Sequence, residues 1–211
     1  MFLRILACVA EGYLLGSVMS AILISKLVYR EDVRQLGSGN SGATNAARVY
    51  GAVIGFATYF GDFLKCVIAC LLGRLIGGWN GETAEICLAA AGFACIVGHS
   101  FPVFFRFKGG KGVACGSAFA LMLDWRIFVI TIGIFLIVAF ATKIVSAGSL
   151  LGCVSVGVCS AIFAHHPVGK LLGIFAAVLV ILMHWQNIDR LIKGQEKPFA
   201  FGKPRKPPRV K

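Results

Sequence analysis

Long apolar runs alternate with short polar stretches along almost the whole chain. The apolar runs occupy residues 3–29, 51–76, 86–97, 113–142, 150–164 and 168–183. Because an α-helix rises about 1.5 Å per residue, about 20 apolar residues cross the hydrocarbon core of a bilayer. The pattern therefore predicts an all-α, polytopic integral membrane protein, organised as a single membrane-embedded domain over residues 1–211.

The run from 113 to 142 decides the topology, because it is too long for one ordinary crossing. The charged triplet Asp124-Trp125-Arg126 interrupts this run. A turn at the triplet makes two shorter helices that leave and return, and the chain then has about seven transmembrane helices with its N-terminus outside. The first half, residues 113–123, is short for a full crossing, so it must begin inside the preceding glycine-rich stretch or lie tilted.

This topology brings four polar stretches to one side of the membrane. They are residues 37–48, residues 98–116, residues 142–149 and the start of the C-terminal tail. The tail, residues 193–211, holds seven Lys and Arg residues against one acid, Glu196. Because cytoplasmic segments carry an excess of Lys and Arg, we expect the tail and the four polar stretches to face the cytoplasm.

Composition supports a membrane protein and argues against several other classes. Of the 211 residues, 58% are hydrophobic, and the mean hydropathy of +0.84 lies outside the range of ordinary soluble domains. The formal net charge of +12 does not indicate nucleic acid, because no surface of interleaved aromatic and basic residues accompanies it. The eight cysteines lie in or beside apolar runs without a C-x-x-C pair, so we expect buried free thiols and no metal site.

The stretch from 98 to 116, GHSFPVFFRFKGGKGVACG, carries the strongest chemical signal. Its Lys-Gly-Gly-Lys-Gly turn, residues 108–112, leaves backbone N–H groups uncovered beside ammonium groups and at the start of a helix. The first polar stretch adds Arg48, whose planar guanidinium suits phosphate oxygens, and the last apolar run ends in His184 and Asn187. Together these groups predict a phosphate site, and the apolar body beneath it indicates a lipid-derived partner.

Three further features limit or widen this interpretation. A literal G-x-G-x-x-G within residues 37–42 follows a membrane helix and not a buried strand, so a dinucleotide site is rejected. Asp62 and Lys65 stand at i and i+3 inside an apolar run, and they form either a structural ion pair or a wall of the polar site. The residues alone fit either transfer of a lipid-linked group or a membrane transporter of phosphate or a phosphorylated metabolite.

Three stretches, GSGNSGATNAAR, GHSFPVFFRFKGGKGVA and HWQNIDRLIKGQE, stand in this order along the chain. They resemble the signature stretches of bacterial acyl-phosphate:glycerol-3-phosphate acyltransferases. The resemblance implies a seven-helix enzyme of the bacterial cytoplasmic (inner) membrane that moves a fatty acyl group from acyl phosphate to the 1-position of glycerol 3-phosphate. Its products would be lysophosphatidic acid and inorganic phosphate, in the first step of phospholipid synthesis. The expected partners are the two substrates and membrane lipids, without a cofactor, a metal, nucleic acid or an obligatory protein partner.

Carried over residue by residue, the resemblance gives a catalytic set of Ser38, Arg48, Lys111, His184 and Asn187. The expected contacts to substrate phosphates are Gly37, Asn40, Thr44, Asn45, His99, Lys108, Gly109, Gly110, Gly112, Ser146, Ser149 and Glu196. His184 is either the general base, a positioning or phosphate-binding group, or a structural histidine, and the departing phosphate is the alternative base. Asn40, Thr44 and Asn45 either contact substrate or close a turn.

Two stretches depart from the family's pattern. TKIVS at residues 142–146 has Lys in place of the usual Arg and Ile in place of Tyr. DFLKC at residues 62–66 ends in Cys where the family has Gly.

Overall fold

The computed structural model describes residues 1–203 and 205, and this part of the chain is helical without a β-strand. Its elements are α1 (Phe2–Gly16), α2 (Ser20–Tyr29), η1 (Val33–Gln35), α3 (Ala43–Tyr50), α4 (Ala52–Gly77), α5 (Glu82–Ser100), η2 (Val103–Phe105), α6 (Val113–Leu123), α7 (Trp125–Thr142), α8 (Val145–Phe163), α9 (Pro167–Leu182) and α10 (Trp185–Ile192). The prediction of an all-α protein is therefore confirmed.

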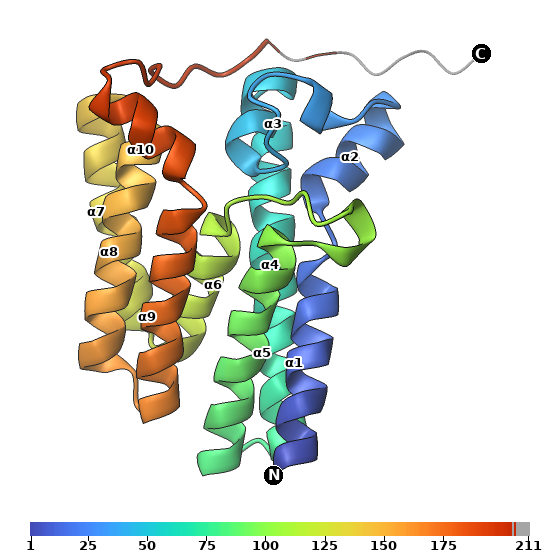
Figure 1. The fold of residues 1–211 in the computed structure, drawn as a ribbon, viewed down its shortest axis with the longest axis vertical. Coiled ribbons are helices and arrows are strands. Elements are labelled where there is room, and N and C mark those ends of the chain that lie inside the picture. Colours follow the sequence, from blue (N-terminus) through green and yellow to red (C-terminus); the bar gives the residue numbers. More distant parts are fainter. Residues whose placement is uncertain (204, 206–211) are drawn as a thin grey trace.

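The long helices run side by side along the long axis of the molecule (Figure 1). Helices α1, α4 and α5 pack against one another in one group, while α7, α8 and α9 form a second. Helix α6 joins the groups, because it packs against α4 and α5 on one side and α7 and α9 on the other. The N-terminus lies at one end of the molecule, and α3, α10 and the tail lie together at the opposite end (Figure 1).

Within the part of the chain that the structure describes, five helical segments are long and apolar enough to cross a membrane: Phe2–Tyr29, α4, Glu82–Phe105, α7 and α8. A sixth appears if α9 and α10, which meet at an angle of 58°, count as one bent span. Helix α6 is apolar but shorter than these. A polytopic membrane protein is thus confirmed, whereas the number seven requires α6 as a crossing and stays a prediction.

The break predicted inside the longest apolar run is present. Helix α6 ends at Leu123 and α7 begins at Trp125, with Asp124 between them. The Asp124 carboxylate accepts a hydrogen bond from the Arg126 backbone N–H at 2.8 Å and pairs with the Arg126 guanidinium at 2.9 Å. These hydrogen bonds hold the pKa of Asp124 down at about 2, so the carboxylate is charged and suited to cap the N-terminus of α7.

The first apolar run is long enough for one continuous helix, but it forms two, because the chain breaks between α1 and α2. A buried ion pair on α4 fills this break, with 2.9 Å between Lys65 Nζ and Asp62 Oδ1. Lys65 donates to the carbonyls of Gly16 and Val18, and Asp62 accepts from the backbone and hydroxyl of Ser20. Of the two alternatives for this pair, the structure supports the structural one, since it satisfies the helix ends that the break exposes.

Two smaller expectations can also be compared with the structure. Helix α8 begins at Val145 and not at the predicted residue 150, so Ser146 and Ser149 lie in its first turns. All eight cysteines are buried and free, which confirms the expectation from their placement in apolar runs.

We expect Asp62→Ala to destabilise the protein by about 3–5 kcal/mol, because it leaves the Lys65 ammonium buried without its carboxylate. Unfolding in detergent micelles, followed by heat or denaturant, measures the change. Asp189→Ala is the matched control, since it removes an exposed i,i+4 pair with Lys193 that contributes little. Equal stability of the two variants would show that the buried pair does not hold the break.

Candidate active site

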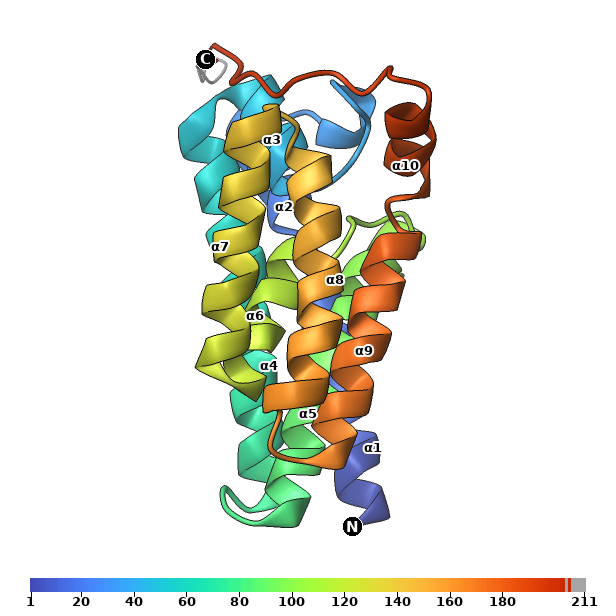
Figure 2. The ribbon, with the colours of Figure 1, turned by 90° about the vertical axis from the view of Figure 1, so that its left-hand side faces the viewer.

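Four segments that are far apart in the sequence meet at the end of the molecule that holds the tail. Figure 2 shows α3 and α10 on opposite sides, the loop before α6 at a lower level, and the tail passing from α10 toward α3 above. The Phe199 N–H donates to the Lys143 carbonyl at 2.8 Å, and the Gly202 N–H donates to the Ala47 carbonyl at 3.1 Å. The predicted polar stretches therefore gather at one end of the fold.

The glycines of the loop before α6 lie where a larger residue does not fit. The Gly110 N–H donates to the His99 carbonyl at 3.0 Å. A Cβ at Gly109 would overlap that carbonyl oxygen, and a Cβ at Gly110 would overlap the His99 ring. Gly112, at the N-cap of α6, has a φ of +85°, which favours glycine. Lys111 is thereby placed immediately ahead of a helix N-terminus.

A chain of side-chain hydrogen bonds connects this loop to α10, α8 and the tail. The Lys111 ammonium donates to Asn187 Oδ1 at 2.5 Å, and Asn187 Nδ2 donates to Glu196 at 2.6 Å. The same carboxylate accepts from the Ser146 hydroxyl at 2.7 Å and from Arg190 Nε at 2.5 Å. The structure thus brings together four of the predicted site residues and adds Arg190, which the sequence reasoning did not select.

Asn45 supports the first polar stretch from the inner side, which fits the second of its two alternatives, that it closes a turn. Its side chain is 2% exposed. Its amide oxygen accepts from the Ser38 backbone N–H at 2.8 Å, and its amide nitrogen donates to the carbonyls of Val33 and Leu36. Gly37 has a φ of +59°, and a Cβ there would overlap the Asn45 amide. Asn45 and Gly37 therefore shape the loop that presents Ser38.

The side chains of His99 and Ser149 have partners inside the protein, and their expected contact with phosphate stays a prediction. His99 is buried, and its Nδ1 lies 3.1 Å from Lys65 Nζ and 3.7 Å from the Asp62 carboxylate. The buried Ser149 hydroxyl donates to the carbonyl of Val145 on its own helix at 3.0 Å. Both side chains are used inside the helical bundle, and His99 contributes to the site through its backbone carbonyl.

The remaining predicted residues are at least partly accessible. Ser38 and Lys108 are exposed, and Asn40, Thr44 and Arg48 are half-buried. The site end of the fold therefore presents cations from α3 and from the loop before α6, together with hydroxyl and amide groups from the first polar stretch.

A family profile described as "Glycerol-3-phosphate acyltransferase" matches residues 6–194. The chain belongs to this family. A glycerol-3-phosphate acyltransferase of Finegoldia magna is 40% identical over 186 residues, covering 87% of this chain and 90% of that protein. One from Synechococcus elongatus is 37% identical over 199 residues, covering 93% and 95%.

Solved structures agree with this assignment. A crystal structure of PlsY (YgiH), an integral membrane glycerol 3-phosphate acyltransferase, in its glycerol 3-phosphate form has a TM-score of 0.84 to this chain at 32% identity, covering 93% of this chain and 96% of PlsY. Its lysophosphatidic acid form gives a TM-score of 0.81 at 33% identity. The resemblance of the three signature stretches is confirmed, and the protein is a membrane acyltransferase.

The electrostatics of this candidate site centre on Lys111. The pKa of Lys111 is lowered to about 8, mainly by burial; the charge of Glu196 opposes this shift, and the charges of Arg190 and Arg48 add to it. Burial acts to raise the pKa of Glu196, but the hydrogen bonds from its partners outweigh burial and lower it. The lysine therefore remains mostly protonated at neutral pH, and a bound anion would relieve its repulsion with the two arginines.

His184 stands between α9 and α10 and is 2% exposed. Its Nδ1 lies 2.7 Å from the Val180 carbonyl, so Nδ1 carries the hydrogen and Nε2 keeps a lone pair. Burial lowers the pKa of His184 to about 4, and the Lys111 charge acts in the same direction. The acyltransferase therefore holds a neutral imidazole that accepts a hydrogen bond but is a weak base.

We expect the stability of the wild-type protein to fall more steeply on acidification than that of Glu196→Gln. A carboxyl whose folded-state pKa is lowered contributes stability above its ordinary value of 4.5, and this contribution is lost as pH falls through the folded-state value. Thermal unfolding in detergent as a function of pH measures the difference. Glu82→Gln, which changes an exposed glutamate, should follow the wild type. Parallel curves for wild type and Glu196→Gln would contradict the role of this carboxylate.

Proposed function

We propose that this acyltransferase transfers a fatty acyl group from acyl phosphate to the 1-hydroxyl of glycerol 3-phosphate, giving lysophosphatidic acid and inorganic phosphate. PlsY, which shares the fold, is known in a glycerol 3-phosphate form and a lysophosphatidic acid form. The observation that carries the proposal is the position of Lys111, which is hydrogen-bonded to Asn187 and lies immediately ahead of the α6 N-terminus. It belongs to the glycine loop, residues 108–112, and it feels the charges of Arg48 and Arg190. Such a group of cations and amides suits two phosphate-bearing substrates that would otherwise repel each other.

The proposed reaction makes modest chemical demands, since acyl phosphate is an activated mixed anhydride. The 1-hydroxyl oxygen attacks the acyl carbonyl carbon, the bond to the phosphate oxygen breaks, and phosphate leaves with that electron pair. Lys111 and the Gly112 amide would align the anions and stabilise the developing oxyanion, while the Gly110 N–H is used to hold the loop against the His99 carbonyl. Arg48 and Ser38 would bind phosphate oxygens from the α3 side, with Asn40, Thr44, Lys108 and Gly109 at the edge of the site.

The hydroxyl proton must also be removed. With a pKa of about 4, His184 is a weak base, whereas the departing phosphate leaves with the electron pair of the broken bond and can take a proton there. The departing phosphate is therefore the better proton acceptor in this proposal. The His184 lone pair would orient the hydroxyl, and Asn187 would hold Lys111 while Glu196 and Ser146 hold Asn187.

The proposal includes the bacterial inner membrane, with the site facing the cytoplasm and the N-terminus outside. The basic tail lies at the site end of the fold, opposite the N-terminus (Figure 1), and basic segments favour the cytoplasmic side. Lys193, Lys197, Lys203 and Arg205 are in the described part of the tail, whereas Lys206, Arg209 and Lys211 lie outside the described residues.

Purified protein in detergent should form lysophosphatidic acid from acyl phosphate and glycerol 3-phosphate, and release phosphate only when both are present. Acyl-coenzyme A and acyl carrier protein should not replace acyl phosphate. Lys111→Ala should lower kcat/KM by about 100-fold or more, while Lys193→Ala, which removes an exposed lysine, should behave like the wild type. Product from a thioester donor alone would overturn the proposed donor. Uptake of labelled glycerol 3-phosphate into vesicles without acylation would favour a transporter instead.

The affinity for glycerol 3-phosphate should fall as pH rises through about 8, because free Lys111 then loses its proton. A bound phosphate favours the ammonium form and raises its pKa, so binding is strongest where Lys111 is charged in the free enzyme. The KM for glycerol 3-phosphate, measured across this pH range, reports the effect. Lys111→Arg should lose the alkaline rise in KM, because a guanidinium stays protonated. An identical rise in that variant would assign the titration to another group.

A further inference from the structure

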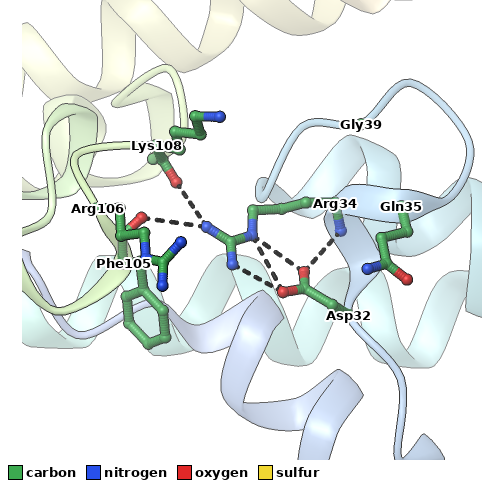
Figure 3. Close-up of a pocket in the computed structure, with 8 residues that line it drawn as sticks. Asp32, Arg34, Gln35, Gly39, Phe105, Arg106 and Lys108 are labelled. Atoms are coloured by element: carbon green, nitrogen blue, oxygen red, sulfur yellow. Dashed lines mark hydrogen bonds and ion pairs between the residues drawn. The ribbon is translucent and has the colours of Figure 1, made fainter.

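The loop that presents Ser38 and the loop that presents Lys111 face each other across a cavity of about 370 Å³ at the edge of the site (Figure 3). The cavity walls include Asp32, Arg34 and Gly39 from one loop and Phe105, Arg106 and Lys108 from the other. The lining residues of the two loops, 32–39 and 105–109, are more than 60 positions apart in the sequence. The distance between the two loops in space is therefore set by tertiary contacts, including those that cross the cavity.

The Arg34 side chain makes this crossing. Its Nη1 donates to the carbonyl of Phe105 at 3.2 Å and to the carbonyl of Lys108 at 3.4 Å. Its guanidinium also lies 5.8 Å from the centre of the Phe105 ring. Figure 3 shows the guanidinium reaching from its own loop to the backbone of the opposite one. Among the described residues, no other hydrogen bond joins residues 30–50 to residues 101–112.

Asp32 fixes the direction in which the guanidinium points. The carboxylate accepts from Arg34 Nη2 at 2.7 Å and from Nε at 3.0 Å, and it also accepts from the Arg34 backbone N–H at 3.0 Å. These contacts use one edge of the planar fork and leave Nη1 for the two carbonyls. Lysine, with a single charged nitrogen, cannot reproduce this arrangement.

Both ends of the bridge are attached to parts of the site. On one side, Asn45 donates to the carbonyls of Val33 and Leu36, which flank Arg34, and accepts from the Ser38 N–H. On the other side, Lys108 stands three residues before Lys111 in the glycine loop. Loss of the bridge would leave the packing of Phe105 against the apolar cluster that contains Val33 as the contact between the two loops. Apolar packing is not directional, so it would fix the relative orientation of the loops less closely than the hydrogen bonds do.

We infer that Arg34 is a positioning residue, which sets the distance and orientation between the Ser38 loop and the Lys111 loop by hydrogen bonding across the cavity. The expected effect of Arg34 on turnover rests on the proposed function, whereas the expected effect on the order of the loop does not. Arg34 itself is not placed against the reacting atoms. Loss of the bridge should therefore disturb alignment of the two substrates more than stability of the fold.

Arg34→Ala and Arg34→Lys should each lower kcat/KM by about 10- to 100-fold, since misplacement by about 1 Å costs up to that much. Arg106→Ala is the matched control, because it removes an exposed arginine from the same cavity. In hydrogen exchange by mass spectrometry, the backbone amides of residues 105–111 should exchange about 10-fold faster in both Arg34 variants than in the control. The alkaline rise in KM should shift to higher pH as Lys111 becomes less confined.

Normal kcat/KM in a folded Arg34→Lys, or unchanged exchange of residues 105–111, would overturn the inference. If Arg34→Ala does not fold, Arg34→Lys decides the outcome alone. The exchange measurement needs no substrate, so it separates this inference from the proposed function. If the loop exchanges faster in the Arg34 variants but the wild-type protein does not acylate glycerol 3-phosphate, the inference about Arg34 stands and the proposed reaction is wrong.

Discussion

The loop before α6 is non-helical backbone that enters the helical bundle, and such backbone is stable within a membrane protein only where other parts of the protein satisfy its polar groups. The His99 carbonyl receives the Gly110 N–H from the inner side. Arg34 donates hydrogen bonds to the Phe105 and Lys108 carbonyls from the outer side. Much of the site follows from this constraint, because the loop can present free amides only if its remaining groups are already bonded.

The same constraint explains the glycines around Lys111. The loop approaches α5 so closely that a Cβ at Gly109 or Gly110 would overlap His99. This approach shortens α6, which starts only at Val113, and it places a helix N-terminus and an ammonium group inside the molecule. Burial lowers the pKa of that ammonium group, and an anion restores it. The close approach of the loop to α5 therefore accounts both for the glycines and for the lowered pKa of Lys111.

Local signals made part of this arrangement predictable from sequence. Asp124 sits between two apolar segments and has the chemistry of a helix cap, so the break near it was readable. The three signature stretches led to the family, because their residues are contiguous. By contrast, the break between α1 and α2 carries no proline, and the groups that satisfy it, Asp62 and Lys65, lie more than 40 residues away on α4.

The side chains whose roles the sequence left open, or did not select, share this long-range character. Residue type alone did not separate Asn45, which holds a loop, from Asn187, which contacts Lys111. Arg34 and Arg190 resemble ordinary interfacial arginines until the tertiary structure shows their acceptors. Sequence therefore identified which segments form the site, while partners from other segments decided which side chains face it.

The bend between α9 and α10 completes the site by redirecting the tail. Because the helices meet at 58°, α10 leaves the bundle direction and Glu196 returns toward Asn187. From there the tail crosses to α3 through backbone hydrogen bonds of Phe199 and Gly202, which depend little on side-chain identity. The tail thereby spans the site end of the fold from α10 to α3. One carboxylate at the start of the tail, Glu196, therefore joins α8 and α10 through Ser146 and Asn187, and two backbone contacts further along carry the chain to α3.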